Sequence, residues 1–219
     1  MKKDSYLRPG NLQEWTGKVL LGLEASRGGT KIPALDASAA LLLLDPQKIF
    51  VSGDSPAFIP GWKAVGGNCL ALLKHAAGMG RLSVVTRHIH PPEDSGGSIL
   101  HFFGRLIRDA DPLSAVADDM GCLREAHVMT KSRHSAFSND RLDGMLRERD
   151  IKTVVIGGVQ ADLCVLATAV EAGTRDFIPV VAADATAAGS ERQHVAVLEA
   201  LAGGLACVMS TREIIEQWH

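Results

Sequence analysis

The chain of 219 residues is poor in aromatic side chains, and this scarcity limits what it can bind. Phe, Trp and Tyr make up 5% of the residues, and Tyr occurs once. A platform on which nucleobases stack needs several aromatic rings beside a cationic groove. The net charge is −2, and the Lys and Arg residues are scattered rather than gathered into a stripe. We therefore expect no nucleic-acid partner, and the charge gives no reason to expect an anionic membrane surface either.

The sequence also lacks a long hydrophobic run and a pattern of paired cysteines. The longest apolar run ends at Leu44 and is far too short to span a bilayer. No apolar segment follows the first residues, so we expect no secretory signal. The four cysteines are Cys69, Cys122, Cys164 and Cys207. They contain no C-x-x-C pair, which argues against a zinc knuckle or a redox dithiol. We expect a cytoplasmic protein, because a reducing compartment suits a reactive thiol.

Apolar runs alternate with helical patterns along most of the chain. We expect strands at residues 39–44, 82–86, 126–129, 153–156, 178–182 and 206–209. We expect helices at residues 62–77, 101–107, 142–149, 163–172, 191–202 and 212–218. This alternation is typical of a parallel sheet covered by helices on both faces. We therefore expect a three-layer α/β/α domain over residues 38–219, preceded by an arm over residues 1–37. The arm should lie on the domain or on a neighbouring subunit.

Cys164 follows one of these strands and lies where a helix is expected to begin. The glycine pair after residues 153–156 should end the strand, and Asp162 should cap a helix that Gly173 closes. Ligands bind at the carboxyl ends of the strands in open α/β sheets. A helix N-terminus also lowers the pKa of a thiol. This stretch alone fits a nucleophilic Cys164 and a buried structural cysteine equally well.

An acid and a lysine follow two other expected strands. Asp45 comes directly after the apolar run that ends at Leu44, and Lys131 comes just after residues 126–129. A buried carboxylate without a partner is costly, so Asp45 should be paired or should face a crevice. Taken singly, Asp45 could be a loop cap and Lys131 a solvated surface lysine. Together with Cys164 they form a possible set of nucleophile, base and orienting group.

Five short motifs occur in a fixed order along the chain. They are Leu44-Asp45-Pro46-Gln47 with Phe50, Thr86-Arg87-His88-Ile89-His90-Pro91, Lys131-Ser132 with His134-Ser135-Ala136-Phe137, Gly158-Val159-Gln160-Ala161-Asp162-Leu163-Cys164, and Asp184-Ala185-Thr186 with His194. From about Ile32 to the C-terminus the chain resembles the isochorismatase-like cysteine hydrolases, which include nicotinamidases and N-carbamoyl amide hydrolases. The resemblance implies a six-stranded parallel sheet and a homodimer or homotetramer.

The resemblance also implies a catalytic triad of Asp45, Lys131 and Cys164. Cys164 would attack a carbonyl carbon of a small amide, carbamoyl or related substrate and form a thioester. Asp45 would accept the thiol proton and pass it to the leaving nitrogen, while the charge of Lys131 favours carboxylate and thiolate. The backbone N–H groups of Gln160 and Cys164 would form the oxyanion hole, and the Val159–Gln160 peptide bond would be cis.

Further residues are candidates for contact with the substrate. They are Gln47, Phe50, His88, His90, His134 and Phe137. Gln47 could instead cap its own loop, and the two Phe residues could belong to the core. With His101, the pair His88 and His90 could make a three-nitrogen metal site. Because the nicotinamidase branch has Asp where this chain has His88, we expect neither a metal nor another cofactor.

Two other functions remain open beside the cysteine hydrolase. The first is a vinyl-ether hydrolase of the isochorismatase type, which protonates an alkene and needs an acid rather than a thiol. The presence of Cys164 argues against it. The second is a catalytically idle scaffold or interaction domain, which has no need of an acid, a lysine and a thiol at three strand ends.

Overall fold

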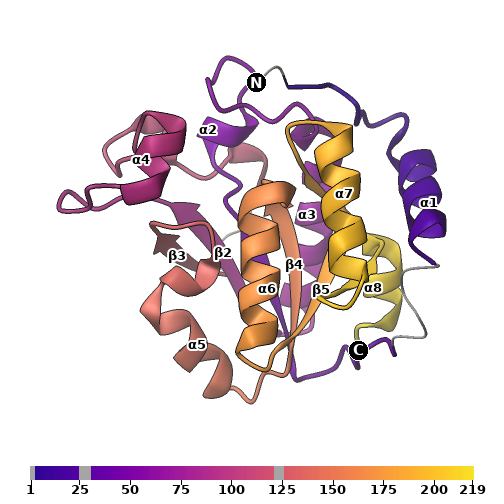
Figure 1. Ribbon diagram of the computed structural model, residues 1–219. Helices are drawn as coiled ribbons and strands as arrows, with labels where there is room; N and C mark the ends of the chain where they lie inside the picture. Colours follow the sequence, from indigo (N-terminus) through magenta and orange to yellow (C-terminus); the bar gives the residue numbers. More distant parts are fainter. Residues whose placement is uncertain (1–2, 25–30, 121–125) are drawn as a thin grey trace.

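The computed structural model describes residues 3–24, 31–120 and 126–219, and its centre is a parallel sheet (Figure 1). The six strands lie in the order β3-β2-β1-β4-β5-β6, and every neighbouring pair is parallel. Their bounds are β1 Ala39–Leu44, β2 Ser83–His88, β3 His127–Lys131, β4 Thr153–Val159, β5 Ile178–Ala187 and β6 Cys207–Met209. The predicted fold class is confirmed.

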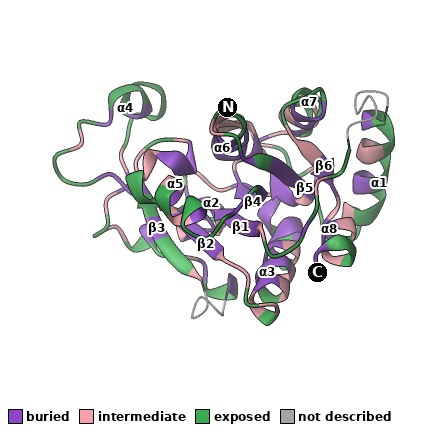
Figure 2. Ribbon diagram, turned by 90° about the horizontal axis from the view of Figure 1, so that it is seen from below, coloured by how far each residue is buried: buried purple, intermediate pink, exposed green. Residues whose placement is uncertain are grey.

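Helices cover both faces of this sheet. Their bounds are α1 Leu12–Leu23, α2 Lys48–Val51, α3 Trp62–Gly78, α4 Gly97–Phe103, α5 Asp140–Arg147, α6 Leu166–Thr174, α7 Glu191–Ala202 and α8 Thr211–Gln217. Figure 2 shows α5, α6 and α7 on one face and α3 and α8 on the other, while α4 stands away from the body. Within the described ranges, no helix has the length and apolar character needed to cross a membrane.

The two central strands are buried along their whole length. All residues of β1 and of β4 are buried. A strand with helices above and below it needs apolar side chains on both faces, which explains the uninterrupted apolar runs. The edge strand β3 instead exposes His127 and Val128.

Strand β4 is longer than the sequence pattern predicts. The expectation that the glycine pair ends it is wrong, because the strand continues through Gly157 and Gly158 to Val159. Gly158 has a φ of 104°, and a Cβ atom there would collide with the backbone of Leu44. Glycine is the residue that tolerates both conditions. The pair therefore lets the ends of β1 and β4 approach closely. Strand β5 also runs beyond its predicted end.

Two predicted helices differ from those in the structure. The helix expected at residues 101–107 is α4, and Gly104 ends it in the left-handed conformation with a φ of 69°. The helix expected at residues 163–172 begins instead as a π-helical turn over Ala161–Val165, which α6 continues. Asp162 does not cap it, since its Oδ2 accepts a hydrogen bond from Gln193 Nε2 at 3.0 Å. Gly173 lies inside α6 rather than after it.

The N-terminal arm contains a helix, α1, that the sequence analysis did not predict. Trp15 on this helix stacks on His194 of α7 with the ring centroids 4.8 Å apart. The Tyr6 hydroxyl lies 2.9 Å from Nδ1 of the same histidine and accepts a hydrogen bond from the backbone N–H of Ala188. The described part of the arm thus packs on its own domain. Residues 25–30 of the arm lie outside the described residues, and so does Cys122.

Candidate active site

The sheet topology brings three chemically active side chains to one edge. Asp45 follows β1, Lys131 is the last residue of β3, and Cys164 follows β4. Strand β1 lies between β2 and β4, so the connections turn in opposite directions on its two sides. In open parallel sheets this switch point is where ligands bind, at the carboxyl ends of the strands.

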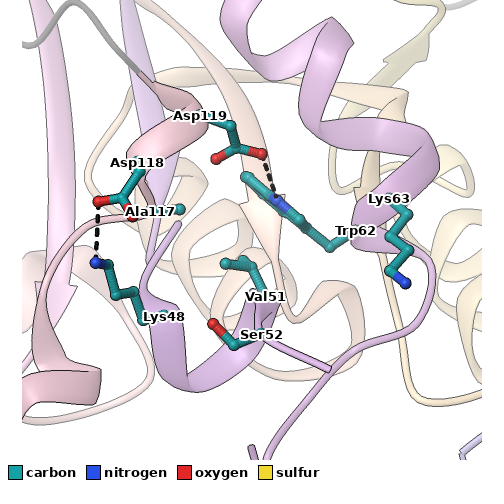
Figure 3. Close-up of a pocket in the computed structure, with 8 residues that line it drawn as sticks. All are labelled: Lys48, Val51, Ser52, Trp62, Lys63, Ala117, Asp118 and Asp119. Carbon is teal, nitrogen blue, oxygen red and sulfur yellow. Dashed lines mark hydrogen bonds and ion pairs between the residues drawn. The ribbon is translucent and has the colours of Figure 1, made fainter. Parts of the chain in front are cut away.

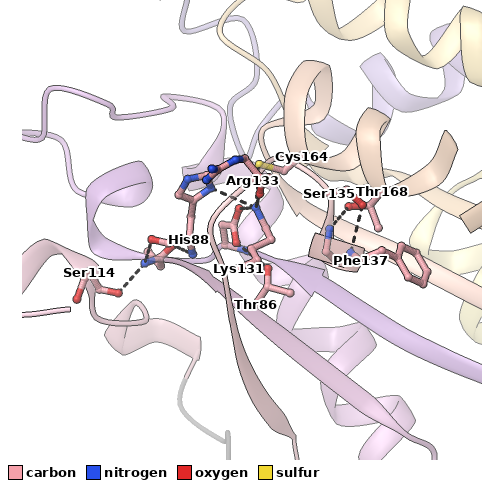
Figure 4. A network of polar contacts seen from close by, with 12 residues as sticks. Thr86, His88, Ser114, Lys131, Arg133, Ser135, Phe137, Cys164 and Thr168 are labelled. Atoms are coloured by element: carbon pink, nitrogen blue, oxygen red, sulfur yellow. Dashed lines mark hydrogen bonds and ion pairs between the residues drawn. The ribbon is translucent and has the colours of Figure 1, made fainter. Parts of the chain in front are cut away.

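The three side chains are in direct contact. Lys131 Nζ lies 2.7 Å from Asp45 Oδ2, and neither side chain has exposed surface. The same Nζ lies 3.3 Å from Cys164 Sγ, and Cys164 is 5% exposed. Figure 4 shows Lys131 between the ring of His88 and the sulfur of Cys164. The ammonium group thus bridges a buried carboxylate and a buried thiol.

Thr86 on β2 fixes the orientation of the Asp45 carboxylate. Its hydroxyl donates to Asp45 Oδ1 at 2.6 Å and accepts from the Asp45 backbone N–H at 3.2 Å. Asp45 has a φ of 50°, a left-handed conformation that Asp adopts more readily than most residues. The sequence analysis did not propose Thr86 as a site residue. The available signal was its place at the head of the second motif. The register pairs Leu43 with Val85, which sets Thr86 beside the end of β1.

The Lys131 ammonium group has two further acceptors. The backbone carbonyl of Arg133 lies 3.0 Å from Nζ, and Nδ1 of His88 lies 3.3 Å from it. The register of β2 and β3 pairs His88 with Lys131. A loop carbonyl two residues after the lysine carries no sequence signal, so Arg133 was not predicted.

Electrostatics favour the charged forms of Asp45 and Lys131. Burial alone would raise the pKa of Asp45, but Lys131, His88 and the Thr86 hydroxyl hold it below its usual value of 3.8. Burial alone would lower the pKa of Lys131, but Asp45 and Cys164 keep it above 10.5. At neutral pH the site therefore holds a carboxylate and an ammonium ion.

The pKa of Cys164 is raised, which corrects the expectation of a lowered value. Burial is the main cause, and the neighbouring Asp45 carboxylate adds to it against the effect of Lys131, so that the pKa lies at about 12. Cys164 lies within the π-helical turn, two residues before α6 begins at Leu166, and burial outweighs the effect of the nearby helix start. The resting group is a thiol that needs a base before it can attack.

The turn that carries Cys164 has the predicted cis peptide bond. It joins Val159 to Gln160, so this expectation is confirmed. The carbonyl of Gln160 then accepts the N–H groups of Leu163 and Val165 at 3.2 and 3.1 Å. These bonds close the turn around Cys164.

Three of the candidate substrate contacts are buried parts of the framework. Gln47 has no exposed surface, donates to the Ser114 carbonyl at 2.7 Å and accepts from the His88 backbone N–H at 2.6 Å. Phe137 stacks on Phe177 with centroids 5.8 Å apart, and in Figure 4 it points away from Cys164. Phe50 is 9% exposed within the hydrophobic core. The structure thus holds the Gln47 amide in loop-positioning bonds and does not bring Phe137 to the triad.

The candidate histidines are divided between two places. The ring centroids of His88 and His90 lie 4.8 Å apart, and those of His88 and His134 lie 6.5 Å apart. Burial lowers the pKa of His134. His101 is exposed on α4, against Phe102. Among the described residues, the potential metal-ligating group is Asp45, His88 and Cys164, whose donor atoms lie within 4.8 Å of one another. His90 and His101 do not belong to this group, so the described residues do not form the three-nitrogen site of His88, His90 and His101. Lys131 Nζ contacts all three members of the group that is present.

A separate surface pocket of about 510 Å³ lies beside α2 (Figure 3). Its lining contains none of the triad residues. Lys48 pairs with Asp118 at 2.9 Å, and the Trp62 indole N–H donates to Asp119 at 3.2 Å. These four polar groups therefore have partners within the protein.

Comparison with known proteins agrees with this geometry. The profile of the isochorismatase domain matches residues 39–213, a range that contains all six strands. The chain belongs to the isochorismatase family. All three triad side chains lie inside the matched range.

Several known proteins are similar to the chain. Enterobactin synthase component B of Escherichia coli K12 is 29% identical over 180 residues, which cover 81% of this chain and 62% of that protein. Nicotinamidase 3 of Arabidopsis thaliana is 30% identical, with 77% and 82% covered. A cysteine hydrolase structure from Pseudomonas syringae pv. phaseolicola 1448A superposes with a TM-score of 0.79 at 21% identity, covering 83% and 92%. The chain thus spans less than two thirds of the first of these relatives.

Proposed function

We propose that this isochorismatase-family protein is a cysteine hydrolase that cleaves a C–N bond of a small amide or carbamoyl compound. The observation that carries the proposal is the ammonium of Lys131, placed 2.7 Å from the Asp45 carboxylate and 3.3 Å from the Cys164 thiol. A carboxylate and a thiol beside one cation form a base and a nucleophile in adjacent positions.

The first half-reaction forms a thioester. The Asp45 carboxylate takes the proton of Cys164, and Sγ attacks the carbonyl carbon of the substrate. The N–H groups of Gln160 and Cys164 hold the oxyanion, a role that typically contributes about 100-fold or more per donor. The tetrahedral intermediate collapses, the C–N bond breaks, and Asp45 passes its proton to the leaving nitrogen. A primary amide releases ammonia at this step.

The second half-reaction hydrolyses the thioester. Asp45 is again a carboxylate and takes a proton from water, and the resulting hydroxide attacks the thioester carbonyl. The C–S bond breaks, and the thiolate of Cys164 recovers the proton from Asp45. Lys131 stays protonated throughout and stabilises each anionic group in turn.

The site favours this reaction over the two alternatives. Protonation of a vinyl ether has no use for a thiol, whereas Cys164 Sγ lies 3.3 Å from the Lys131 ammonium that also contacts Asp45. A scaffold would gain nothing from burying Asp45 and Lys131, since the desolvation cost of such a pair commonly exceeds its Coulombic gain. The similarity to a protein named nicotinamidase adds support for an amide substrate. We also propose that the chain acts as a cytoplasmic homodimer or homotetramer.

Ammonia release from a panel of small amides and carbamoyl compounds tests the proposal. Nicotinamide and N-carbamoyl amino acids belong in the panel because relatives are named for related amides. The Cys164→Ala variant should lose all turnover, while Cys69→Ala, which removes another buried thiol, should keep it. Equal turnover in the wild type and in Cys164→Ala would contradict the covalent mechanism. Failure of every compound would contradict the assignment to C–N bonds.

A further inference from the structure

One nitrogen of the His88 ring is committed to Lys131. Nδ1 lies 3.3 Å from Nζ, and the strand register holds the two residues opposite each other. An ammonium ion has hydrogens to donate and no lone pair, so Nδ1 must be the acceptor. A neutral imidazole carries one hydrogen, which the contact with Lys131 therefore places on Nε2.

The ring of His88 stays neutral over the physiological range. Burial is the main cause and the charge of Lys131 the next, and together they lower its pKa to about 3. The Nε2–H group is thus a donor on a neutral ring over the physiological range. His88 is 5% exposed, and among residues 3–24, 31–120 and 126–219 its ring has a side-chain hydrogen-bond contact through Nδ1 alone, so Nε2 is free to donate to a ligand.

His90 supplies a second, independent sign of a missing partner. Its side chain is 1% exposed, and neither ring nitrogen has a hydrogen-bond partner in the described part of the chain. Its position is set by the backbone, because its N–H donates to the Ile107 carbonyl at 2.8 Å and its carbonyl accepts from Arg108 at 3.2 Å. Buried polar groups are nearly always paired, so the two unpaired ring nitrogens of His90, next to the ring of His88, indicate a ligand.

We propose that His88 and His90 form a neutral imidazole subsite for a second polar group of the substrate, to which His88 donates from Nε2. This rests on the proposed function, because it concerns the substrate of the same site. The group is a hydrogen-bond acceptor close to the scissile bond, such as a carbonyl, a carboxylate or an aromatic ring nitrogen. A cationic substituent is disfavoured, since Lys131 holds a positive charge 3.3 Å from His88.

Pairs of amides that differ only in one acceptor test the subsite. Suitable pairs are a benzamide with its aza analogue, and an N-alkylurea with the N-carbamoyl amino acid that carries an added carboxylate. We expect kcat/KM to favour the acceptor-bearing member by about tenfold or more, the value of one hydrogen bond. His88→Asn keeps an acceptor near Lys131, because Oδ1 replaces Nδ1, but it lacks the Nε2 donor. In this variant the preference should disappear, whereas exposed His127→Asn should preserve it.

Nitrogen-15 NMR of the imidazoles tests the subsite without turnover. In Cys164→Ala we expect His88 to be the neutral Nε2–H tautomer from about pH 5 to about pH 8. An acceptor-bearing amide should shift the signals of His88 and His90, and its partner without the acceptor should not. Such shifts without ammonia release in the wild type would keep the subsite and refute the proposed function. A protonated or Nδ1–H His88, an unchanged preference in His88→Asn, or a stoichiometric metal ion on these rings would overturn the subsite.

Discussion

Removal of the Lys131 charge should destabilise the fold as well as stop the reaction. In Lys131→Met the Asp45 carboxylate keeps its fully buried position but loses the cation 2.7 Å away. Breaking a buried ion pair in this way costs about 3–5 kcal/mol. For a domain of this size that corresponds to a fall in Tm of about 6–20 °C, at about 2–4 °C per kcal/mol. Denaturant unfolding at pH 7, followed by circular dichroism, measures the loss.

The pH dependence identifies Asp45 as the cause. In the wild type the pKa of Asp45 in the folded state lies below the usual value of 3.8. The Asp45 carboxylate therefore stabilises the fold at neutral pH, and this stabilisation is lost as the pH falls below 3.8 and through the folded-state pKa. In Lys131→Met the cation no longer offsets the effect of burial on Asp45. The pKa of Asp45 in the folded state should therefore rise above its value in the unfolded chain. The stability of the variant should then decrease as the pH rises above about 4. The stability gap between the two proteins should therefore be smallest in acid and largest at neutral pH.

Two further variants complete this experiment. Asp45→Asn combined with Lys131→Met removes both charges and should recover most of the lost stability, while activity stays absent. Lys152→Met removes an exposed lysine and should leave stability unchanged. A loss below about 1 kcal/mol in Lys131→Met, the range of exposed ion pairs, would refute the buried-pair reasoning. So would a stability gap that is the same at every pH.

Three other variants and the wild-type pH–rate profile have defined outcomes. Thr86→Val removes the hydrogen bond to Asp45 and should lower kcat/KM by about tenfold while moving the acid limb of the pH–rate profile upward; an unmoved limb would refute the role of the hydroxyl. The wild-type profile should show no inflection near the ordinary histidine pKa of 6.5, because His88, His90 and His134 all have lowered pKa values. Gly158→Ala should abolish soluble expression, since its Cβ meets the Leu44 backbone. Gly173→Ala, in an open helical position, should raise stability by up to about 1 kcal/mol, and equal behaviour of the two glycine variants in thermal melts would contradict the packing argument.

The fold was largely predictable because buried parallel strands leave a strong pattern. The run at residues 39–44 has apolar side chains for both covering layers and was assigned its full length. Strand β4 was cut short because glycine usually interrupts strands, whereas here it permits close contact with Leu44. The arm helix α1 was missed because only part of it is buried, so its apolar pattern is weak.

The candidate site was predictable where a residue type carries the chemistry, and not where environment decides. The strand ends indicated Asp45, Lys131 and Cys164, and the structure brings these side chains together. The pKa of Cys164 is raised rather than lowered, because the effect of burial outweighs that of a short helical turn. Burial depends on the tertiary structure and cannot be seen in the local sequence. Gln47 is predicted as a substrate contact from its place in the motif, and the structure adds that its amide joins the backbones of His88 and Ser114, which are distant in sequence.

Trapping the acyl-enzyme tests the central claim most directly. Wild-type protein is mixed with an amide that it hydrolyses. The mixture is quenched in acid within one turnover and analysed by intact-protein and peptide mass spectrometry. The mechanism predicts an added acyl mass on the peptide that contains Cys164, sensitive to hydroxylamine as a thioester should be, and no adduct in Cys164→Ala. Turnover with no adduct under any quench condition, or an adduct on another residue, would contradict the account.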